Sequence, residues 1–432
     1  MTKKRLIIVA ALALAAAIPA IAQQAETKGP TADDIHEMER KRFGFGELVP
    51  GRDSDQKSPR AANFDEAKVG NLVPPPLFAS PADKTRQGWV KRRQQLARLI
   101  EDNWVGRIPA AANKVKIVWT KAKVAGREGY DAEHWTGRIA TPDGRSGPVI
   151  DATVTFPKVA KRVPALIDYA YIWPAGFKLP GPPPPDTQAM VLNRSWAQVD
   201  YRPQLLQADT AAQVQQGVIG LVRWPREQHD WGALRAWGWG ASRLREELAK
   251  DPRIDGSQVS LAGHSRFGKA VLVAAAFDHK FADALVSSSG AGGAKLMRRE
   301  FGEAWTNMAG SYAYHWYTPE VMEYAGHKTV AALPVDAHML IALRAPHPLF
   351  VSSGSADKGD AWVDPRGMWV ATSLAEPAWK LFGLPVPPSS KMPKVLVGYR
   401  DYPLAFYQHD QGHVPWPSYE HFMDHEAKFA RK

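Results

Sequence analysis

The sequence predicts an α/β protein, a three-layer α/β/α sandwich around a mostly parallel central sheet with surface insertions. Short, nearly continuous apolar runs recur from about residue 163 onward, which is typical of strands buried on both faces. Helical segments separate several of these runs, as in a parallel sheet covered by helices. At 432 residues and 45% hydrophobic composition, the chain can also bury a full core.

The N-terminus has the pattern of a secretory signal. Lys3, Lys4 and Arg5 precede an apolar run, and Ala20 and Ala22 form an A-x-A arrangement. The run is short for a membrane anchor, and no stop-transfer pattern follows it. We therefore expect a signal peptide at residues 1–22, cleavage after Ala22, and a secreted or periplasmic protein.

The next segment, residues 23–60, mixes charges, Gly and Pro without a sustained period, and we expect a mobile leader there. Residues 61–432 contain no internal repeat and no clean interdomain linker. They are expected to form a single catalytic domain, with a proline-rich insertion at 174–188 and an aromatic-rich connection at 288–317.

The first elements of this domain are a helix and an antiparallel opening. Trp89, Leu96, Leu99 and Ile100 have helical spacing within 88–109. Three alternating or β-branched runs follow, and they predict strands at 115–120, 134–141 and 149–157.

The later apolar runs predict the parallel part of the sheet. These strands are expected at 163–172, 216–223, 257–265, 281–290, 347–355 and 393–400. Long helices are expected at about 233–249, 266–277 and 366–382, and Pro377 should kink or split the last one.

The composition limits the chemistry and the partners. The chain has no Cys, which excludes disulfides, thiol nucleophiles and cysteine metal sites. Its formal charge of +11 favours acidic partners, and an acidic polysaccharide suits an exported protein better than nucleic acid does. A generally basic solvated surface explains the charge equally well.

The stretch "SLAGHSRFGKA" at 260–270 places Ser265 at a turn between a predicted strand and a helix. Ligands of open parallel sheets lie beyond the carboxyl ends of the strands. The arrangement is similar to the nucleophile elbow G-x-S-x-G, but Phe267 stands where the second Gly is expected, and Gly268 follows it. A Ser that merely caps a helix is the alternative.

A serine nucleophile needs a histidine base and a carboxylate to orient it, in the chain order Ser, acid, His for hydrolases of this architecture. Four histidines follow the last predicted strand: His409, His413, His421 and His425. We choose His413, which follows Gly412 in a loop. His421 and His425 are weaker choices, since both fall on a terminal helix, where they are expected to pack or to face solvent. They are four residues apart but lack the Glu of an HExxH metal motif.

The acid is expected in the loop after the strand at 347–355. That loop offers Asp357, Asp360 and Asp364. Asp364 precedes Pro365 at a helix start, where capping is the expected role. Asp360 is the first choice and Asp357 the second.

Several ordered segments resemble the glucuronoyl esterases of carbohydrate esterase family 15, from about residue 65 to the end. They read "DWGALRAWGWGASR", "GHSRFGKA", "SSGAGGAKLMRREFGE", "LPVDAHMLIALRAPHPLFV", "GDAWVDPRG" and "QGHVPW". The resemblance implies an α/β-hydrolase fold. It also implies cleavage of the ester between (4-O-methyl)glucuronic acid of glucuronoxylan and a lignin alcohol. Serine-based ester hydrolysis requires no metal or organic cofactor.

The resemblance also implies roles for individual residues. Ser265 matches the nucleophile, His413 the base and Arg266 the arginine that assists the oxyanion hole. The positions that hold the sugar match Lys269, Glu303 and Trp362.

One position departs from the family pattern. Ser288 stands where many members carry the catalytic Glu, so the acid must come from elsewhere, and some bacterial members use an Asp in the later loop that corresponds to Asp360. Each of the three sugar-binding positions also has a simpler alternative that stays open. Lys269 could be a solvated lysine, Glu303 a surface carboxylate and Trp362 a core aromatic.

The expected reaction passes through an acyl-enzyme. Ser265 attacks the ester carbonyl, His413 moves the proton to the departing alcohol, and Asp360 stabilises the imidazolium. Oxyanion donors are expected from Arg266 and from a backbone N–H within 169–177.

Two other functions remain open at this point. One is another polysaccharide esterase, such as an acetyl xylan esterase, and the other is a catalytically silent carbohydrate-binding relative. We expect a glucuronoxylan or lignin-carbohydrate ester as substrate, no nucleic acid partner, no stable membrane association after signal cleavage, and a monomer.

Overall fold

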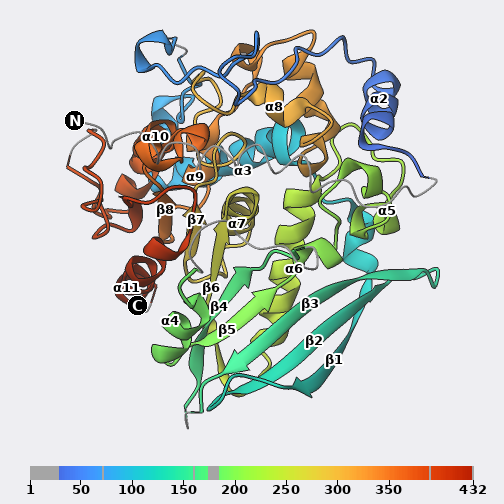
Figure 1. Ribbon diagram of the computed structural model, residues 1–432, viewed down its shortest axis with the longest axis vertical. Helices are drawn as coiled ribbons and strands as arrows, with labels where there is room; N and C mark the ends of the chain where they lie inside the picture. The colour runs from blue at the N-terminus through green and yellow to red at the C-terminus, as the bar shows by residue number, and fades with distance from the viewer. Residues whose placement is uncertain (1–28, 71–72, 159–160, 174–183, 389–390, 431–432) are drawn as a thin grey trace, which may run out of the picture.

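The computed structural model describes residues 29–70, 73–158, 161–173, 184–388 and 391–430. Within them, nine strands form one sheet in the order β1-β2-β3-β5-β4-β6-β7-β8-β9. Figure 1 shows the sheet and its helices, with the longest strands at one end. The predicted signal peptide, residues 1–22, lies outside the described residues.

The sheet is antiparallel at one end and parallel over the rest. Strands β1, β2, β3 and β5 pair antiparallel in that order, and β5 then pairs parallel with β4. Every pairing from β4 through β6, β7 and β8 to β9 is parallel. The strands are β1 Lys116–Val124, β2 Asp131–Ala140, β3 Ser146–Phe156, β4 Val163–Tyr169, β5 Ala197–Tyr201, β6 Ile254–His264, β7 Ala284–Ser287, β8 Leu349–Ser353 and β9 Leu404–Gln408. The antiparallel opening and the mostly parallel sheet are confirmed.

Helices cover both faces of the parallel strands. Alternate residues of each strand belong to two separate buried clusters, as the two-residue period of a strand requires. The larger cluster includes α3 Arg86–Ile100, α6 Ala233–Leu248, α7 Arg266–Phe277, α9 Ala337–Ala342 and α10 Pro365–Lys380. The smaller includes α4 Thr187–Asn193 and α11 Tyr419–Phe429. The three-layer α/β/α arrangement is therefore confirmed.

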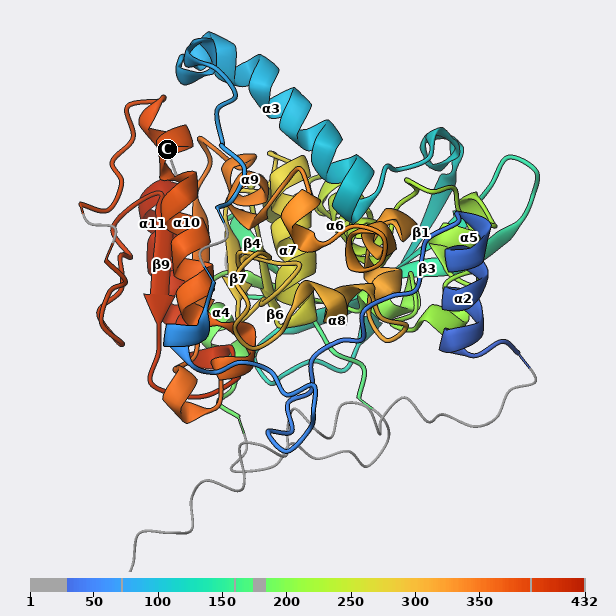
Figure 2. The ribbon, with the colours of Figure 1, turned by 90° about the horizontal axis from the view of Figure 1, so that it is seen from above.

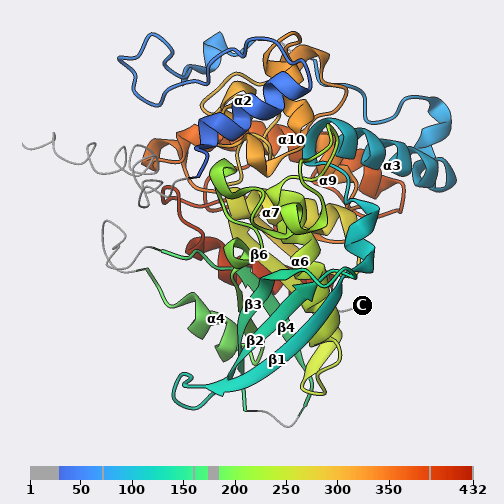
Figure 3. The ribbon, with the colours of Figure 1, turned by 90° about the vertical axis from the view of Figure 1, so that its right-hand side faces the viewer.

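The antiparallel strands extend beyond these helices. Figure 3 shows β1, β2 and β3 reaching away from the end of the molecule where α2, α3, α9 and α10 gather. Of the described residues, none forms a helix long and apolar enough to cross a membrane.

The strand expected at 216–223 is wrong, because helix α5 Val218–Val222 occupies this run. Val218 and Ile219 are fully buried, and the Ile219 N–H donates to the side chain of Gln207. Periodicity alone cannot distinguish a short apolar run in a strand from one in a buried helical turn.

The strand expected at 393–400 is also wrong. Val395, Leu396 and Val397 form an exposed turn, in which Leu396 has φ 68°. The last strand is β9, a few residues later. Both faces of this strand are buried: Ala405 and Tyr407 face one layer of helices, while Leu404 and Phe406 face the other. Strand β5, with a short and partly polar sequence, was missed entirely.

The expected mobile leader contains a docked helix, α2 Ala32–Arg42. Thr31 caps this helix through a reciprocal hydrogen-bond pair with Asp34, and Ile35 is buried. The carboxylate of Glu39 forms an ion pair with Arg226, and both side chains are completely buried. Helix α2 lies beside α5 (Figure 1, Figure 2). Within the described part of the predicted leader, helix α2 is thus packed against the rest of the chain.

The remaining helices follow the predictions closely. Helix α7 has the predicted bounds and α6 ends one residue earlier than predicted, whereas α3 ends at Ile100, well before the end of the stretch 88–109 in which it was expected. Helix α10 continues through Pro377 as one element, so the expected split does not occur. The short helix α8 Trp305–Ala309 lies in the aromatic-rich connection.

Candidate active site

The strand β6 ends at His264 and helix α7 begins at Arg266, so Ser265 alone forms the turn between them. Its backbone angles are φ 57° and ψ −126°, a strained conformation for a residue with a side chain. A Cβ on Gly263 would lie 2.5 Å from the carbonyl oxygen of Phe267, so only glycine fits there. This is the geometry of a nucleophile elbow.

The departure at Phe267 has a packing explanation. Its side chain is completely buried and its ring contacts those of Tyr171 and Trp237. At Gly268, by contrast, a Cβ would lie 2.6 Å from the carbonyl oxygen of Ser287, because α7 crosses close to β7. The close approach falls one residue later than the common motif expects.

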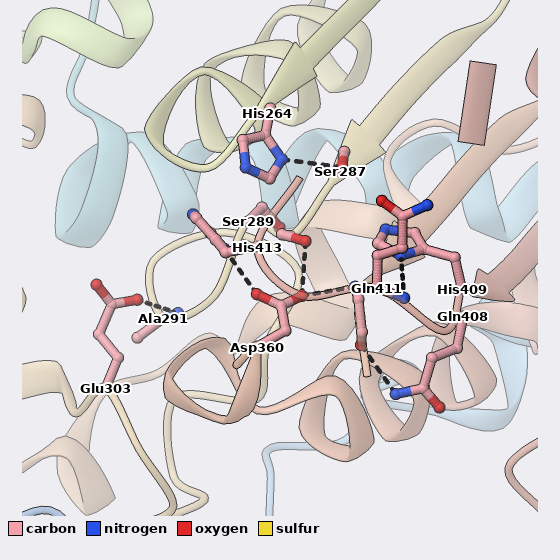
Figure 4. Close-up of polar contacts among 12 residues, drawn as sticks. His264, Ser287, Ser289, Ala291, Glu303, Asp360, Gln408, His409, Gln411 and His413 are labelled. Atoms are coloured by element: carbon pink, nitrogen blue, oxygen red, sulfur yellow. Dashed lines mark hydrogen bonds and ion pairs between the residues drawn. The ribbon is translucent and has the colours of Figure 1, made fainter. Parts of the chain in front are cut away.

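The loops after β8 and β9 bring Asp360 and His413 together. The His413 Nδ1 atom lies 2.6 Å from Asp360 Oδ1 (Figure 4). Asp360 is buried, whereas the His413 side chain remains 24% exposed, so the imidazole can reach a bound molecule while its partner cannot. The other Asp360 oxygen, Oδ2, accepts hydrogen bonds from Ser288 Oγ at 2.7 Å and from the Gly354 N–H at 2.6 Å.

The elbow lies beside this pair. The ring centroid of His264, the residue before Ser265, is 4.3 Å from that of His413. The His264 ring also contacts Ser287 Oγ at 3.1 Å (Figure 4). Burial, followed by the neighbouring histidines, lowers the pKa of His264 well below its usual value, so this ring is neutral. The carboxyl ends of β6, β7, β8 and β9 therefore converge on one site.

The guanidinium of Arg266 is held by two side chains from distant segments. It donates to Asp209 at 2.6 Å and to the Tyr312 hydroxyl at 3.2 Å. Asp209 also accepts from Trp316 at 2.6 Å and contacts His315 at 3.3 Å. Burial would raise the pKa of Asp209, but Arg266 and these partners lower it to about 2. Arg266 is thus positioned by a permanently ionised carboxylate.

Lys269 lies one turn along α7 and is almost completely buried, so it is not a solvated surface lysine. Its Nζ donates to the Ser289 carbonyl at 2.6 Å and to Glu303 Oε2 at 3.1 Å. Burial lowers the pKa of Lys269, and Glu303 opposes that effect. Glu303 also accepts from the Ala291 N–H at 2.9 Å (Figure 4).

Trp362 lies next to this ion pair. Its carbonyl accepts from the Glu303 N–H at 2.7 Å, and its half-buried side chain packs against the core. The structure therefore brings the predicted residues Lys269, Glu303 and Trp362 into one group.

The alternatives for base and acid have other surroundings. Asp357 is exposed, and Asp364 caps α10 through the Gly367 N–H, as predicted. His409 is completely buried, and His425 contacts Asp283 in a fully buried pair. His421 contacts Arg400. In the described part of the chain, no group of three or more metal-ligating side chains occurs.

Sequence reasoning missed the residues that hold these groups in place. Asp209, Tyr312 and Tyr171 were not singled out, and Tyr171 donates to the His264 carbonyl at 2.9 Å. None carries a local signal, because Asp209 is 57 residues from Arg266 and follows no motif. Of the stretch 169–177, expected to supply an oxyanion donor, residues 174–177 lie outside the described residues.

The fold and the site define an α/β-hydrolase with the groups of a serine-type ester hydrolase. A family model for fungal glucuronyl esterases matches residues 140–383, more than half of the chain. A solved CE15 glucuronoyl esterase from Teredinibacter turnerae is 36% identical, with a TM-score of 0.85, over 92% of this chain and 99% of its own. The chain therefore belongs to the glucuronoyl esterase family, carbohydrate esterase family 15.

Other relatives agree with this placement. The carbohydrate esterase MZ0003, from an unknown prokaryotic organism, is 28% identical over 420 residues, which cover 85% of this chain and 92% of its own. A 4-O-methyl-glucuronoyl methylesterase of Hypocrea jecorina is 27% identical over 335 residues, which cover 74% of this chain and 63% of that protein.

Proposed function

We propose that the protein hydrolyses the ester between (4-O-methyl)glucuronic acid of glucuronoxylan and lignin alcohols through an acyl-enzyme. The observation that carries the proposal is the contact of 2.6 Å between His413 and the buried Asp360, at the strand edge where Ser265 occupies a strained elbow. Family membership supports the ester of a glucuronic acid as the bond that is cleaved.

In this mechanism, Ser265 Oγ attacks the ester carbonyl while His413 takes its proton. Asp360 keeps the imidazole in the tautomer that presents Nε2 to the serine and stabilises the imidazolium that forms. His413 then protonates the departing alcohol. Water repeats the cycle on the acyl-enzyme and releases glucuronic acid.

The tetrahedral intermediate carries a negative charge on the former carbonyl oxygen. Arg266 follows Ser265 directly, and its ion pair with Asp209 holds the guanidinium in one orientation. A preorganised donor of this kind typically contributes about 10²- to 10³-fold in rate.

Lys269, Glu303 and Trp362 are proposed to bind the sugar. The Lys269–Glu303 ion pair is nearly buried, which fixes both groups as hydrogen-bond partners for ring hydroxyls. The half-buried indole of Trp362 offers an apolar face suited to a pyranose ring.

The test is release of glucuronic acid from its benzyl and methyl esters. Wild type should turn over, and Ser265→Ala and His413→Ala should lose at least about 10³-fold in kcat. Asp360→Ala should also inactivate the enzyme, while Asp357→Ala should not. Wild type without turnover, or an active Ser265→Ala variant, would defeat the proposal. Faster deacetylation of acetylated xylan would favour an acetyl xylan esterase, and xylan binding without hydrolysis would favour a silent relative.

We further propose that the protein is exported and acts as a monomer in the periplasm or outside the cell. The support for export is the charged, apolar and A-x-A pattern of residues 1–22. N-terminal sequencing of the exported protein should begin at Gln23, and light scattering should give the mass of a single chain.

A further inference from the structure

The carboxylate of Asp360 is completely engaged by protein groups. One oxygen faces His413, and the other receives both the Ser288 hydroxyl at 2.7 Å and the Gly354 N–H at 2.6 Å. Asp360 is 1% exposed and Ser288 is completely buried, so water does not substitute for either contact. The two donors and His413 thus share one buried carboxylate, so a change in either donor should alter the contact between Asp360 and His413.

Ser288 adopts an unfavourable backbone conformation to make its contact. Its φ is 43°, in the left-handed region that residues with a Cβ rarely occupy. Its N–H donates to the Ser352 carbonyl at 2.8 Å, which ties the residue to β8. A glycine would relieve the backbone, yet the position carries a side chain whose hydroxyl reaches Asp360.

The two neighbouring serines have different partners. Ser287 Oγ contacts His264, and Ser289 Oγ accepts from the Ala294 N–H at 2.9 Å. Within this run of three serines, Ser288 is thus the one whose side chain bonds to Asp360.

We propose that Ser288 is a positioning residue that orients the Asp360 carboxylate and weakens the electrostatic stabilisation that this carboxylate gives to the His413 imidazolium. A hydroxyl that donates to a carboxylate oxygen disperses part of the negative charge, so the carboxylate stabilises the adjacent imidazolium less. The inference rests on the proposed function, in which His413 is the base. Because the Gly354 N–H remains on the same oxygen, loss of the hydroxyl should shift the chemistry without leaving that oxygen unpaired.

The experiment compares pH profiles of kcat/KM for methyl glucuronate, an uncharged substrate, in wild type and Ser288→Ala. The acid limb should move to higher pH by about half a unit, because the imidazolium is better stabilised. Looser orientation of the carboxylate should lower kcat about 2- to 10-fold, with KM unchanged.

Two further variants separate the hydroxyl from the backbone and from general packing. Ser288→Gly removes the hydroxyl and relieves the strained φ, so it should fold at least as well as wild type and show the same shift as Ser288→Ala. Ser352→Ala also truncates a buried serine, but one whose hydroxyl has no partner among the described residues, and its acid limb should stay in place.

The outcomes separate the two proposals. An active wild type whose acid limb is unchanged in both Ser288 variants overturns the inference and leaves the proposed function standing. The inference is equally overturned if Ser352→Ala gives the same shift, since the effect would then follow from packing. Wild type without turnover defeats the proposed function and this inference together.

Discussion

At the scale of single residues, burial and immediate partners decide the chemical state of the site. Asp209 and Lys269 are both deeply buried, and both carry a partner of opposite charge. Removing water from a charge is costly unless such a partner remains. These ion pairs therefore act as fixed points that hold Arg266 and Glu303 in place.

Asp209→Asn should test the fixed position of Arg266. The amide removes the charge that holds the guanidinium, so kcat should fall roughly 10- to 100-fold, with some loss of stability. Steady-state kinetics and thermal melting measure the two effects separately. Asp410→Asn, an exposed acid near the His413 loop, serves as the control and should change neither. Unchanged kcat in Asp209→Asn would show that Arg266 needs no such anchor.

At the scale of elements, the docking of helix α2 includes a completely buried ion pair between Glu39 and Arg226. Glu39 Oε2 lies 2.6 Å from Arg226, which also donates to the Tyr317 carbonyl at 2.8 Å. The helix brings few buried apolar side chains of its own, chiefly Ile35. Its docking is therefore governed by electrostatics more than by packing.

Glu39→Ala should destabilise the protein by about 3 to 5 kcal/mol, because it leaves the buried Arg226 charge unpaired. Chemical denaturation with urea measures the loss. The double variant Glu39→Leu with Arg226→Met should recover much of it, since neither charge then remains buried. A single variant as stable as wild type would contradict the buried pair.

Helix α10 carries a buried carboxylate at Glu376, of which one oxygen has no hydrogen-bond partner among the described residues. Burial raises its pKa to about 7, and the nearby Lys380 opposes the rise. Between about pH 4.5 and 7 the folded chain thus keeps a proton that the unfolded chain loses. Stability from this group is complete below that range and falls as the pH rises through it.

Glu376→Gln should remove this loss. The melting temperature of the variant should equal that of wild type near pH 4 and exceed it at pH 8, by the equivalent of roughly 1 to 3 kcal/mol. Glu420→Gln, on the exposed side of α11, is the matched control and should follow wild type at both values. The same difference at pH 4 and pH 8 would rule out the titration of Glu376.

At the scale of the whole molecule, two features come from composition: the absence of Cys, and a net charge of +11 that becomes +8 once Lys3, Lys4 and Arg5 leave with the predicted signal peptide. Without disulfides, the two clusters on either face of the sheet supply the stability. The positive charge favours approach to a polymer that carries free uronic acids.

The charge predicts a selective effect of salt. Raising NaCl from about 20 to 500 mM should lower kcat/KM on polymeric glucuronoxylan esters several-fold, because screening weakens long-range attraction. The uncharged methyl glucuronate should be nearly unaffected, and comparing the two substrates in one salt series makes the measurement. Equal salt sensitivity of both would argue that the charge is a solvated surface without a role in substrate approach.

The sequence by itself determined the features that are encoded in short stretches of neighbouring residues. The parallel sheet follows from apolar runs, the elbow at Ser265 from its strand-turn-helix context, and the cap at Asp364 from its place before Pro365. The order Ser, acid, His also limited the acid to one loop. The strand predictions at 216–223 and 393–400 failed, because a short aliphatic run has no residue period that distinguishes a strand from a turn or a helix.

Only the tertiary structure decided which distant groups meet. It buried Asp360 against His413 and left Asp357 in solvent, and it paired Asp209 with Arg266. It also docked the leader through Glu39. These contacts join residues tens to hundreds of positions apart, and the parallel strands bring them together at one edge of the sheet. No local pattern records such a contact, because burying each group is costly unless its partner is there to offset the lost water, and the partner is brought there only when the sheet has formed.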